Sequence, residues 1–442
     1  MGRLTRWLAP LLLASLLLVL GADAVAAFDG FGTSSADSTY GKEIRFTTTL
    51  NGDSPDRLEL LIRTMGTEGS LVVQVPASGS AAEYVWDTSV DYVVPNTLIT
   101  YQWRAIDGDK AVVSPEAQIR YDDDRPGLDW QSVQLGEATV HWYGDNEDEA
   151  LHLGELSAVG VDQAEQLLGS ELAGPVDVFV YISAEDFFGA LGPGAREWTG
   201  AATYPEKRTI FMWNSPEAGS QAYLETVMIH EITHIVFHDA TENPFHEPAR
   251  WLNEGFATWS ETQDASEERA TVEQEASGDG LFSFDAITEQ FPIGERGGRL
   301  SYAQGTTMID KIIAAHGREA IARIAAAYRD GASDAEALQA GTGVTADDLY
   351  AAYFADFGVD EPTPIEPDPI AASNVDRPTA GPVDPGGVDP GAEPPPEGAP
   401  GDGGGSSSGT AVAVLGGLAI GLAAAGGAAL AMSRRADRRS RT

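Results

Sequence analysis

The sequence contains no cysteine in its 442 residues. This absence excludes a disulfide framework, a cysteine nucleophile and any thiolate ligand for a metal ion. The folded part of the chain therefore depends on its hydrophobic core for stability. With 43% hydrophobic residues, a chain of this length can form one.

Basic residues are also scarce. The chain has 27 Lys and Arg against 68 Asp and Glu, which gives a formal net charge of −41 at pH 7. A surface of this charge repels nucleic acid and anionic lipid headgroups, so we expect no nucleic-acid partner. Strong acidity favours solubility and carries no information about the fold.

The long apolar runs lie near the two ends of the sequence. Residues 1–27 begin with two arginines, continue as LAPLLLASLLLVL and end in small residues, which is the pattern of a secretory signal peptide. Cleavage after Ala24 or Ala27 fits this pattern, and an uncleaved membrane anchor is the alternative interpretation.

The second apolar run, residues 411–432, holds no charged side chain, and residues 433–442 after it carry five arginines. A helix of this length, at about 1.5 Å per residue, crosses the hydrocarbon core of a bilayer. Flanking positive residues stay in the cytoplasm. We therefore predict a single-pass protein of the cell membrane, with the lipid bilayer around residues 411–432, extracytoplasmic N-terminal domains and a basic cytoplasmic tail.

Residues 358–410 precede this apolar run and contain twelve of the 25 prolines, together with the run GDGGGSSSGT. A segment of this composition buries too little apolar surface to fold. We predict a disordered stalk, extended where it is rich in proline and flexible where it is rich in glycine and serine.

Residues 28–124 have the pattern of an all-β domain. Runs such as IRFTTTL, LELLIRT and LITYQWRAI are rich in β-branched and aromatic residues, and Asn-Gly and Asp-Gly turn pairs occur between such runs. Ile99, Tyr101 and Trp103 alternate as on one buried strand face. We predict a β-sandwich, and its YQWRAID run resembles fibronectin type III or immunoglobulin-like modules.

Residues 128–357 change in character along their length. Strands are expected at 138–143 and 176–182 and a hairpin within 200–213, whereas the spacing after Trp213 is almost wholly helical. Strands followed by helices predict an α+β fold rather than a doubly wound parallel sheet.

The pentapeptide HEITH, residues 230–234, lies in a stretch with helical apolar spacing. On a helix His230 and His234 share one face, one turn apart, so both imidazoles can reach one metal ion. Glu231 lies about 100° further round, close to the ion but turned away from direct ligation, where a general base for a metal-bound water would sit. A buried helix that merely carries two histidines is the alternative interpretation.

A catalytic zinc site has three protein ligands, so the two histidines need a third residue beside them. A second helix is predicted to begin near Pro248, and it carries Glu254 twenty residues after His234. A helix–loop–helix of that length can return the Glu254 carboxylate to the same ion.

HEITH followed by WLNEGFATWSE resembles the gluzincin metallopeptidases, in particular the aminopeptidase N family and its peptidase MA-like relatives. The resemblance covers roughly residues 195 to 320 and implies a zincin-like domain with one catalytic Zn²⁺ per chain. It implies that His230, His234 and Glu254 are the zinc ligands. It also makes Glu231 the general base for a zinc-activated water.

Two further segments are similar to parts of this family. The segment SYAQG is similar to the family's Tyr-x-x-Gly segment, which implies that Tyr302 stabilises the oxyanion of the reaction. The hairpin at 200–213 stands where the family places the edge strand that pairs with an extended substrate.

The sequence departs from the family pattern in two places. GAREW at 194–198 lacks the Met and Asn of the segment that reads a free amine, so endopeptidase and aminopeptidase activity both stay open. One turn after Glu254 stands Thr258, where a carboxylate partner for a ligand histidine is expected, and Glu261 one turn later is the alternative.

Taken together, these patterns predict an α+β protein whose zincin-like domain, residues 128–357, follows the β-sandwich at 28–124. The predicted function is a membrane-anchored, extracytoplasmic zinc metallopeptidase acting on a peptide or protein substrate. The alternative, from a different class, is a surface adhesion or scaffold protein with a degenerate or structural zinc domain. The sequence indicates neither a cleavage preference nor an oligomeric state.

Overall fold

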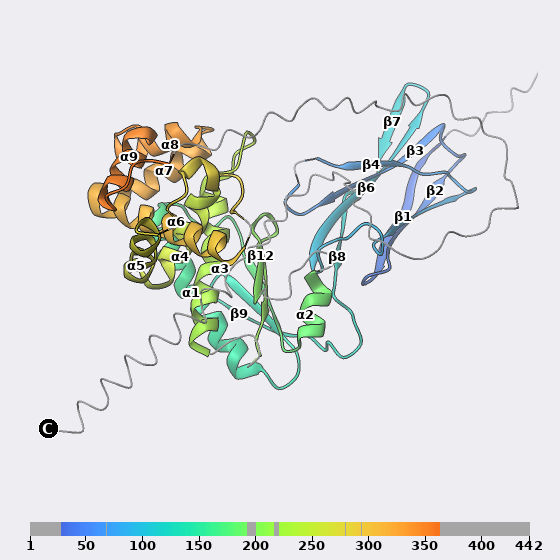
Figure 1. The fold of residues 1–442 in the computed structure, drawn as a ribbon. Helices are drawn as coiled ribbons and strands as arrows, with labels where there is room; N and C mark the ends of the chain where they lie inside the picture. Colours follow the sequence, from blue (N-terminus) through green and yellow to red (C-terminus); the bar gives the residue numbers. More distant parts are fainter. Residues whose placement is uncertain are drawn as a thin grey trace, which may run out of the picture. The chain divides into compact units, whose positions relative to one another are not determined.

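The computed structural model describes residues 28–67, 69–191, 200–215, 221–278, 280–292 and 294–362. These residues form two compact units (Figure 1). The first holds the described residues up to Asp91 with Leu98–Asp122, and the second holds Tyr92–Thr97 with the described residues from Asp123 onward. The unit boundary after Asp122 lies close to the end predicted for the β-domain, residue 124.

Several predicted segments lie outside the described residues. They are the signal peptide at 1–27, nearly all of the stalk, the span at 411–432, the tail at 433–442 and the GAREW run at 194–198. Within the described ranges, no helix is both long and apolar enough to cross a membrane.

The first unit is built from two antiparallel sheets. The smaller sheet has the order β1-β2-β5, and the larger has the order β4-β3-β6-β7 with β8 also paired to β6. The strands are β1 (Gly30–Thr39), β2 (Glu43–Asn51), β3 (Arg57–Thr64), β4 (Leu71–Gln74), β5 (Ala81–Asp87), β6 (Thr97–Asp107), β7 (Lys110–Val113) and β8 (Ala117–Tyr121).

The predicted alternation in β6 is confirmed, because its odd-numbered residues from Thr97 to Ala105 are buried and the residues between them are not. Tyr101 packs its ring edge against Phe46 of β2 with 5.0 Å between the ring centroids. Strand β1 has no such apolar pattern and was not predicted. Its serines instead bond to β2 through hydroxyl groups, Ser34 to Thr48 at 2.8 Å and Ser35 to Thr47 at 2.9 Å.

The second unit contains one five-stranded sheet with the order β12-β13-β11-β10-β9. Its strands are β9 (Gln131–Leu135), β10 (Ala138–Trp142), β11 (Val176–Tyr181), β12 (Ala201–Tyr204) and β13 (Thr209–Trp213). The predicted hairpin is present as β12 and β13, joined by the short 3-10 helix η1 (Pro205–Lys207).

The sequence predicted an α+β fold rather than a doubly wound parallel sheet. The structure corrects the second part of this prediction, because part of the sheet is parallel. The sheet is mixed, since β10 pairs with β11 and β11 pairs with β13 in parallel. Helix α1 (Glu147–Leu168) connects β10 to β11, and α2 (Ala184–Leu191) follows β11. A helical crossover returns the chain to the same end of the sheet, which makes the next strand parallel.

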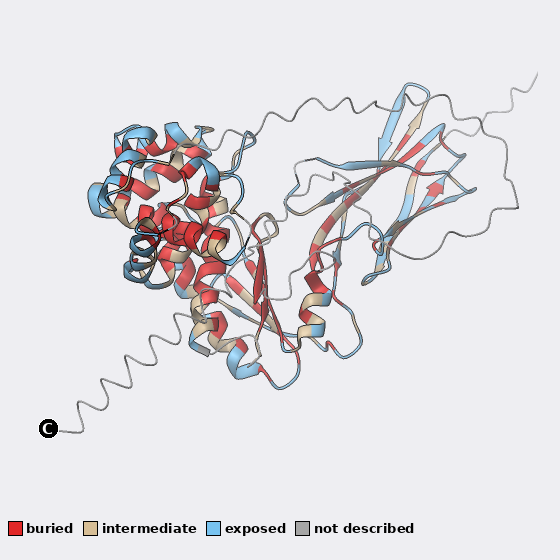
Figure 2. Ribbon diagram, viewed as in Figure 1, coloured by how far each residue is buried: buried red, intermediate tan, exposed pale blue. Residues whose placement is uncertain are grey.

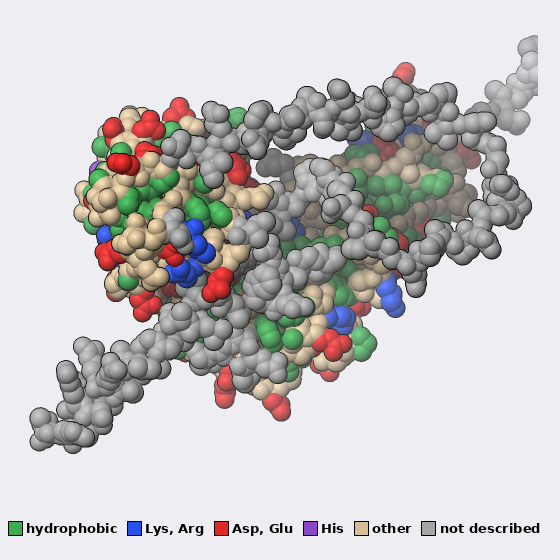
Figure 3. All heavy atoms as spheres, viewed as in Figure 1, with side chains coloured by type: hydrophobic (Ala, Val, Ile, Leu, Met, Phe, Trp, Pro, Cys, Tyr) green, Lys and Arg blue, Asp and Glu red, His purple; other side chains and the backbone are tan. Residues whose placement is uncertain are grey.

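Seven helices follow the sheet among the described residues, as the helical spacing predicted. They are α3 (Gln221–Thr241), α4 (Arg250–Thr262), α5 (Ser266–Ala276), α6 (Glu295–His316), α7 (Glu319–Arg329), α8 (Asp334–Thr342) and α9 (Ala346–Asp356). The buried residues of this part gather where the helices meet (Figure 2). Acidic side chains are spread over its visible face, with basic ones in smaller number (Figure 3).

The sheet of the second unit has a core on each face. Val178, Val180 and Met212 belong to the large core shared with α1, α3, α4 and α6. Phe179 and Phe211, at alternate positions, belong to an aromatic core on the opposite face. Helix α3 packs against α1, α4 and β12, so the HEITH motif lies between the sheet and the other helices.

Candidate metal and catalytic centre

Helix α3 is buried on all sides in its middle, where every residue from Val227 to Phe237 is buried. Three ionisable residues lie within this segment: His230 is 7% exposed, Glu231 4% and His234 1%. Burying ionisable groups costs free energy unless each has a partner. The partners of these three side chains therefore decide whether the helix is only part of the core.

The inward-facing atoms of three ligand candidates converge. The Nε2 atoms of His230 and His234 are 3.1 Å apart, and Oε2 of Glu254 lies 3.6 Å from each of them. Glu254 is 1% exposed, and its buried Oε2 has no hydrogen-bond partner within the described ranges. The loop between α3 and α4 thus brings Glu254 back to the two histidines.

The outward-facing nitrogens of the same histidines are occupied. Nδ1–H of His230 donates to Oε1 of Glu261 at 2.8 Å, and Nδ1–H of His234 donates to Oδ1 of Asn253 at 2.8 Å. In the tautomer that carries its only proton on Nδ1, each imidazole directs the lone pair of Nε2 inward. Two such nitrogens and an unpaired carboxylate oxygen are a donor set that fits a divalent metal ion.

The local electrostatics favour a cation at this point. Burial lowers the pKa of His234 to about 4, so this imidazole is neutral at physiological pH. Burial raises the pKa of Glu254, but the neighbouring imidazoles of His230 and His234 and the charge of Arg250 lower it to about 2 overall. A neutral imidazole and an ionised carboxylate are the protonation states that bind a metal.

Glu231 belongs to the same helix but is held by a different element. Its Oε2 accepts a hydrogen bond of 2.6 Å from the hydroxyl of Thr203 in β12. Burial raises the pKa of Glu231 to about 7, and the charge of His230 and the Thr203 hydrogen bond oppose this increase. A carboxyl group with a pKa near neutrality is suited to proton transfer.

Tyr302, in α6, brings a hydroxyl group to the same region. Its side chain is 3% exposed and its ring centroid lies 6.3 Å from that of His230. Burial and then the charge of Glu254 raise the pKa of Tyr302 well above its ordinary value, so the phenol stays protonated. Its hydroxyl has no hydrogen-bond partner among the described residues and can donate to a ligand.

Two glycines allow α4 and α6 to approach closely enough to combine these groups. Gly255 follows Glu254, and Gly305 lies three residues after Tyr302. A Cβ atom on Gly255 would overlap the carbonyl carbon of Gly305, and one on Gly305 would lie 2.5 Å from the Trp251 carbonyl oxygen. The glycines of the NEG and SYAQG segments are therefore needed for helix packing next to the site.

The structure brings together all five residues that the sequence singled out, His230, Glu231, His234, Glu254 and Tyr302. Of the two candidates beside His230, Glu261 makes the hydrogen bond and Thr258 does not. The buried Thr258 hydroxyl has no partner among the described residues. Sequence reasoning missed the contacts of Asn253 and Thr203. For Asn253 a signal existed, since it directly precedes the ligand in NEG; for Thr203, in the run AATY, the sequence offered none.

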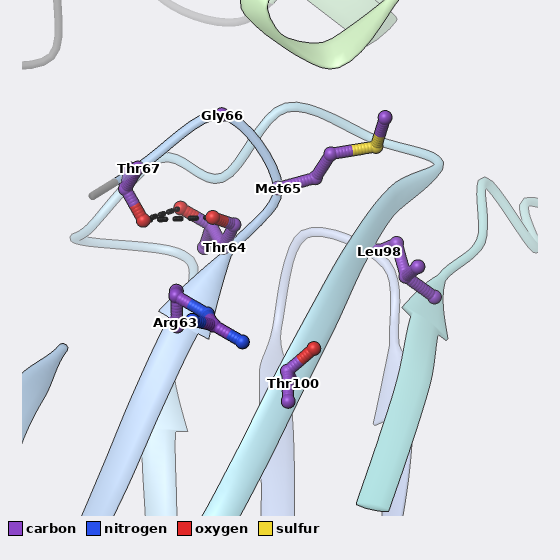
Figure 4. A pocket seen from close by; sticks show the side chains of 7 residues that line it. All are labelled: Arg63, Thr64, Met65, Gly66, Thr67, Leu98 and Thr100. Atoms are coloured by element: carbon purple, nitrogen blue, oxygen red, sulfur yellow. Dashed lines mark hydrogen bonds between the residues drawn. The ribbon is translucent and has the colours of Figure 1, made fainter. Parts of the chain in front are cut away.

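Two other places in the chain could be taken for binding sites, but polar groups there are already paired. His238, Asp239 and Glu242 form a second, partly exposed group at the end of α3, but Asp239 is already paired with Arg208 at 3.1 Å. In the first unit, a hollow of about 350 Å³ lies beside the loop from Arg63 to Thr67 (Figure 4). There the Thr67 hydroxyl is bonded to the Thr64 carbonyl oxygen at 2.7 Å, so it is already satisfied.

Comparison with known proteins bears on the second unit. The model of the family described as Peptidase MA superfamily matches residues 158–355, a range that contains the converging residues described above. This match supports a zincin-like peptidase family for that part of the chain and suggests a metallopeptidase-like function. No curated protein matches the chain.

Among solved structures, the chain is similar to one described as "Crystal structure of Br derivative BhCBM56". The identity is 8%, the match covers 21% of this chain and 91% of that chain, and the TM-score is 0.17. A likeness at this TM-score supports no conclusion about either unit.

Proposed function

We propose that the protein is a zinc-dependent metallopeptidase whose Zn²⁺ is held by His230, His234 and Glu254. The observation that carries this proposal is the unpaired, buried Oε2 of Glu254 between two Nε2 atoms whose outer nitrogens are fixed. Two imidazoles and one carboxylate are the ligand set of catalytic rather than structural zinc. When bound, zinc supplies Lewis-acid chemistry, which polarises a peptide carbonyl and lowers the pKa of water.

The residues of the chain supply the proton transfers and the remaining stabilisation. Glu231 accepts the proton of the attacking water and passes it to the leaving amine. Tyr302, protonated and without a partner, donates a hydrogen bond to the carbonyl oxygen as that oxygen gains negative charge. Arg250 bonds to Oε1 of Glu254 at 3.3 Å, which directs the other oxygen, Oε2, toward the histidines.

We further propose that the substrate binds as an extended peptide along β12. This strand pairs with β13 on one side and with no other strand among the described residues, so its second edge can accept a peptide. Whether the enzyme acts as an endopeptidase or an aminopeptidase depends on what lies beyond this edge, and both activities remain part of the proposal.

The proposed location is the outer face of a cell membrane. It rests on the signal-peptide pattern of residues 1–27, the stalk composition of 358–410 and the apolar run at 411–432 followed by arginines. Membrane fractionation tests it: the full-length protein should stay with the membrane after high-salt washing, and truncation after Phe357 should release it. Recovery of the intact, uncleaved chain in the soluble fraction would contradict the anchor.

The peptidase activity is tested with the purified full-length protein and a library of peptides. We expect hydrolysis that a zinc chelator abolishes and added Zn²⁺ restores, and hydrolysis slower by about 10² to 10⁴-fold in Glu231→Gln. Stoichiometric zinc in a protein that cleaves neither peptides nor unfolded proteins would instead favour the scaffold alternative, with zinc in a structural role.

A further inference from the structure

We propose that Thr203 is a positioning residue that holds the Glu231 carboxylate and determines which of its oxygens exchanges the proton. The proposal rests on the proposed function of Glu231 as general base. Thr203 lies in β12, on a different element from HEITH and 28 residues before Glu231 in the chain.

The strand directs Thr203 toward α3. In β12 the side chains of Ala202 and Tyr204 belong to the aromatic core on one face of the sheet, whereas Ala201 belongs to the core on the face that α3 covers. Because strand side chains alternate, Thr203 lies on the same face as Ala201. It is 0% exposed, and it is the residue of this strand that brings a hydroxyl group to that face.

The hydrogen bond makes the two oxygens of Glu231 different. The Thr203 hydroxyl donates to Oε2 at 2.6 Å, a length typical of a hydroxyl bonded to a carboxylate. Oε1 accepts no hydrogen bond from any residue within the described ranges. The bond therefore fixes the orientation of the carboxylate and leaves Oε1 as the oxygen available to the water proton.

Other buried threonines in this unit show what a purely structural hydroxyl does. Thr233 and Thr307 donate to carbonyl oxygens one turn back in their own helices, and Thr209 of β13 donates to the Lys207 carbonyl oxygen at 3.0 Å. Thr203 instead bonds to the side chain of the proposed base. A valine would fill the same space in the strand, so packing alone does not require a hydroxyl at this position.

The position in β12 adds a mechanistic consequence. The same strand carries the free edge proposed for the substrate and the hydroxyl that holds the base. A peptide aligned on β12 is therefore placed relative to Glu231 by one rigid element. Such preorganisation lowers the reorganisation needed at the moment of reaction and acts on kcat more than on KM.

The test compares Thr203→Val, Thr203→Ser and the matched control Thr209→Val in the full-length protein. Losing a hydrogen bond to a charged group should lower kcat of Thr203→Val roughly 10- to 100-fold, with KM, zinc content and melting temperature near wild type. Thr203→Ser keeps the hydroxyl and should recover kcat to within about threefold of wild type, while Thr209→Val should leave it unchanged.

Two further measurements separate positioning from a general structural effect. In a Glu231→Gln background, Thr203→Val should lower the residual activity by less than about twofold, because the residues act as a unit. Crystal structures should show one Glu231 carboxylate orientation in wild type and several in Thr203→Val. The crystal structures do not require an active enzyme. They therefore test whether Thr203 holds the Glu231 carboxylate even if the peptidase proposal fails.

Three results would overturn the inference: wild-type kcat in Thr203→Val, equal losses in the wild-type and Glu231→Gln backgrounds, or an unchanged Glu231 orientation. If Thr203→Val fails to fold, Thr203→Ser still decides, since misplaced or inactive Glu231 in that variant contradicts a role of the hydroxyl. Absence of chelator-sensitive hydrolysis in the wild type contradicts the proposed function and not the Thr203 contact.

Discussion

Each unit of the protein buries a glutamate in its core, and the two carboxylates have different surroundings. In the β-unit, Glu59 is 7% exposed and paired with two guanidinium groups, Nε of Arg57 at 2.9 Å and Nε of Arg104 at 2.6 Å. In the helical unit, Glu254 is 1% exposed and one of its oxygens has no hydrogen-bond partner. The charge of Glu59 is neutralised by two arginines, whereas Glu254 directs an unpaired oxygen toward two histidines.

The difference teaches how to separate a structural from a functional buried charge. A fold gains nothing from an unpaired buried oxygen, because its desolvation is not compensated. Where the unpaired oxygen faces imidazole nitrogens whose other nitrogens are fixed, the donor set fits a cation. Such local violations of packing rules are expected at functional sites, and here they gather at the crossing of α3, α4 and α6.

The most direct test of this comparison replaces each of the two glutamates by glutamine. Of the variants considered, Glu254→Gln should have the largest effect on zinc content and activity. Glu254→Gln should lose most of the one Zn²⁺ per chain and all detectable hydrolysis, because an amide is a weak ligand. Glu59→Gln should keep both and lower the free energy of unfolding by only about 1 kcal/mol, since its arginines are partly exposed. Metal analysis, kinetics and urea unfolding of both variants decide; full zinc occupancy in Glu254→Gln would contradict the ligand assignment.

Glu231 sharpens the contrast within the site, because it is buried beside the three proposed ligands and is proposed to act as a base instead. Glu231→Gln should lower kcat by about 10² to 10⁴-fold, the usual contribution of general acid–base catalysis. Zinc content and melting temperature should stay near wild type, because glutamine keeps the shape and the bond from Thr203. A variant that loses its zinc would make Glu231 a ligand, and a variant with full activity would exclude it as the base.

The sequence predicted the parts of this site that are encoded locally. His230 and His234 are one helical turn apart, and Glu254 and Gly255 stand together in one short run, so spacing and resemblance were enough to single them out. The helical C-terminal region also follows from residue periodicity. These features depend on neighbours within one element.

What the sequence could not show depends on pairing between distant segments. Thr203 has no local signal, because its role is set by the packing of β12 on α3. The parallel pairing of β11 with both β10 and β13 follows from how the crossovers return, which alternation within a strand does not encode. Strand β1 was missed because it pairs with β2 through its backbone and carries hydroxyl side chains rather than an alternating apolar pattern.

Glu261 allows a smaller test of how the ligand histidines are held. It bonds to His230 at 2.8 Å, in the way that Glu225 bonds to His152 at 2.9 Å on the surface of the same unit. Partners of ligand histidines typically contribute 10- to 100-fold to metal affinity, so Glu261→Gln should weaken zinc binding by about that factor. The matched variant Glu225→Gln should leave it unchanged. Equal zinc affinity in all three proteins, measured by chelator competition, would contradict the role of Glu261.

Glu268 in α5 is the intermediate case, a partly buried carboxylate without a basic partner in the described part of the chain. Burial, and then the negative charges of Glu261, Glu267 and Asp264, raise its pKa to about 7 from an ordinary 4.5. The folded protein therefore holds a proton that the unfolded chain releases as the pH increases above about 4.5. Its contribution to stability must fall between pH 4.5 and 7 and stay low above pH 7.

Replacing this group should therefore stabilise the protein at alkaline pH only. Glu268→Gln should raise the free energy of unfolding by about 1 kcal/mol at pH 8 and by almost nothing at pH 4, because solvent screening reduces the full linkage energy of a partly exposed group. The control Glu273→Gln removes the same charge from an exposed position of α5 and should have little effect at either pH. Urea unfolding followed through the helical signal provides the measurement. If Glu268→Gln raised the free energy of unfolding equally at pH 4 and pH 8, the surroundings of Glu268 would not disfavour its ionised form. Glu268 would then not be an intermediate case, and the comparison would reduce to the unpaired Glu254 and the neutralised Glu59.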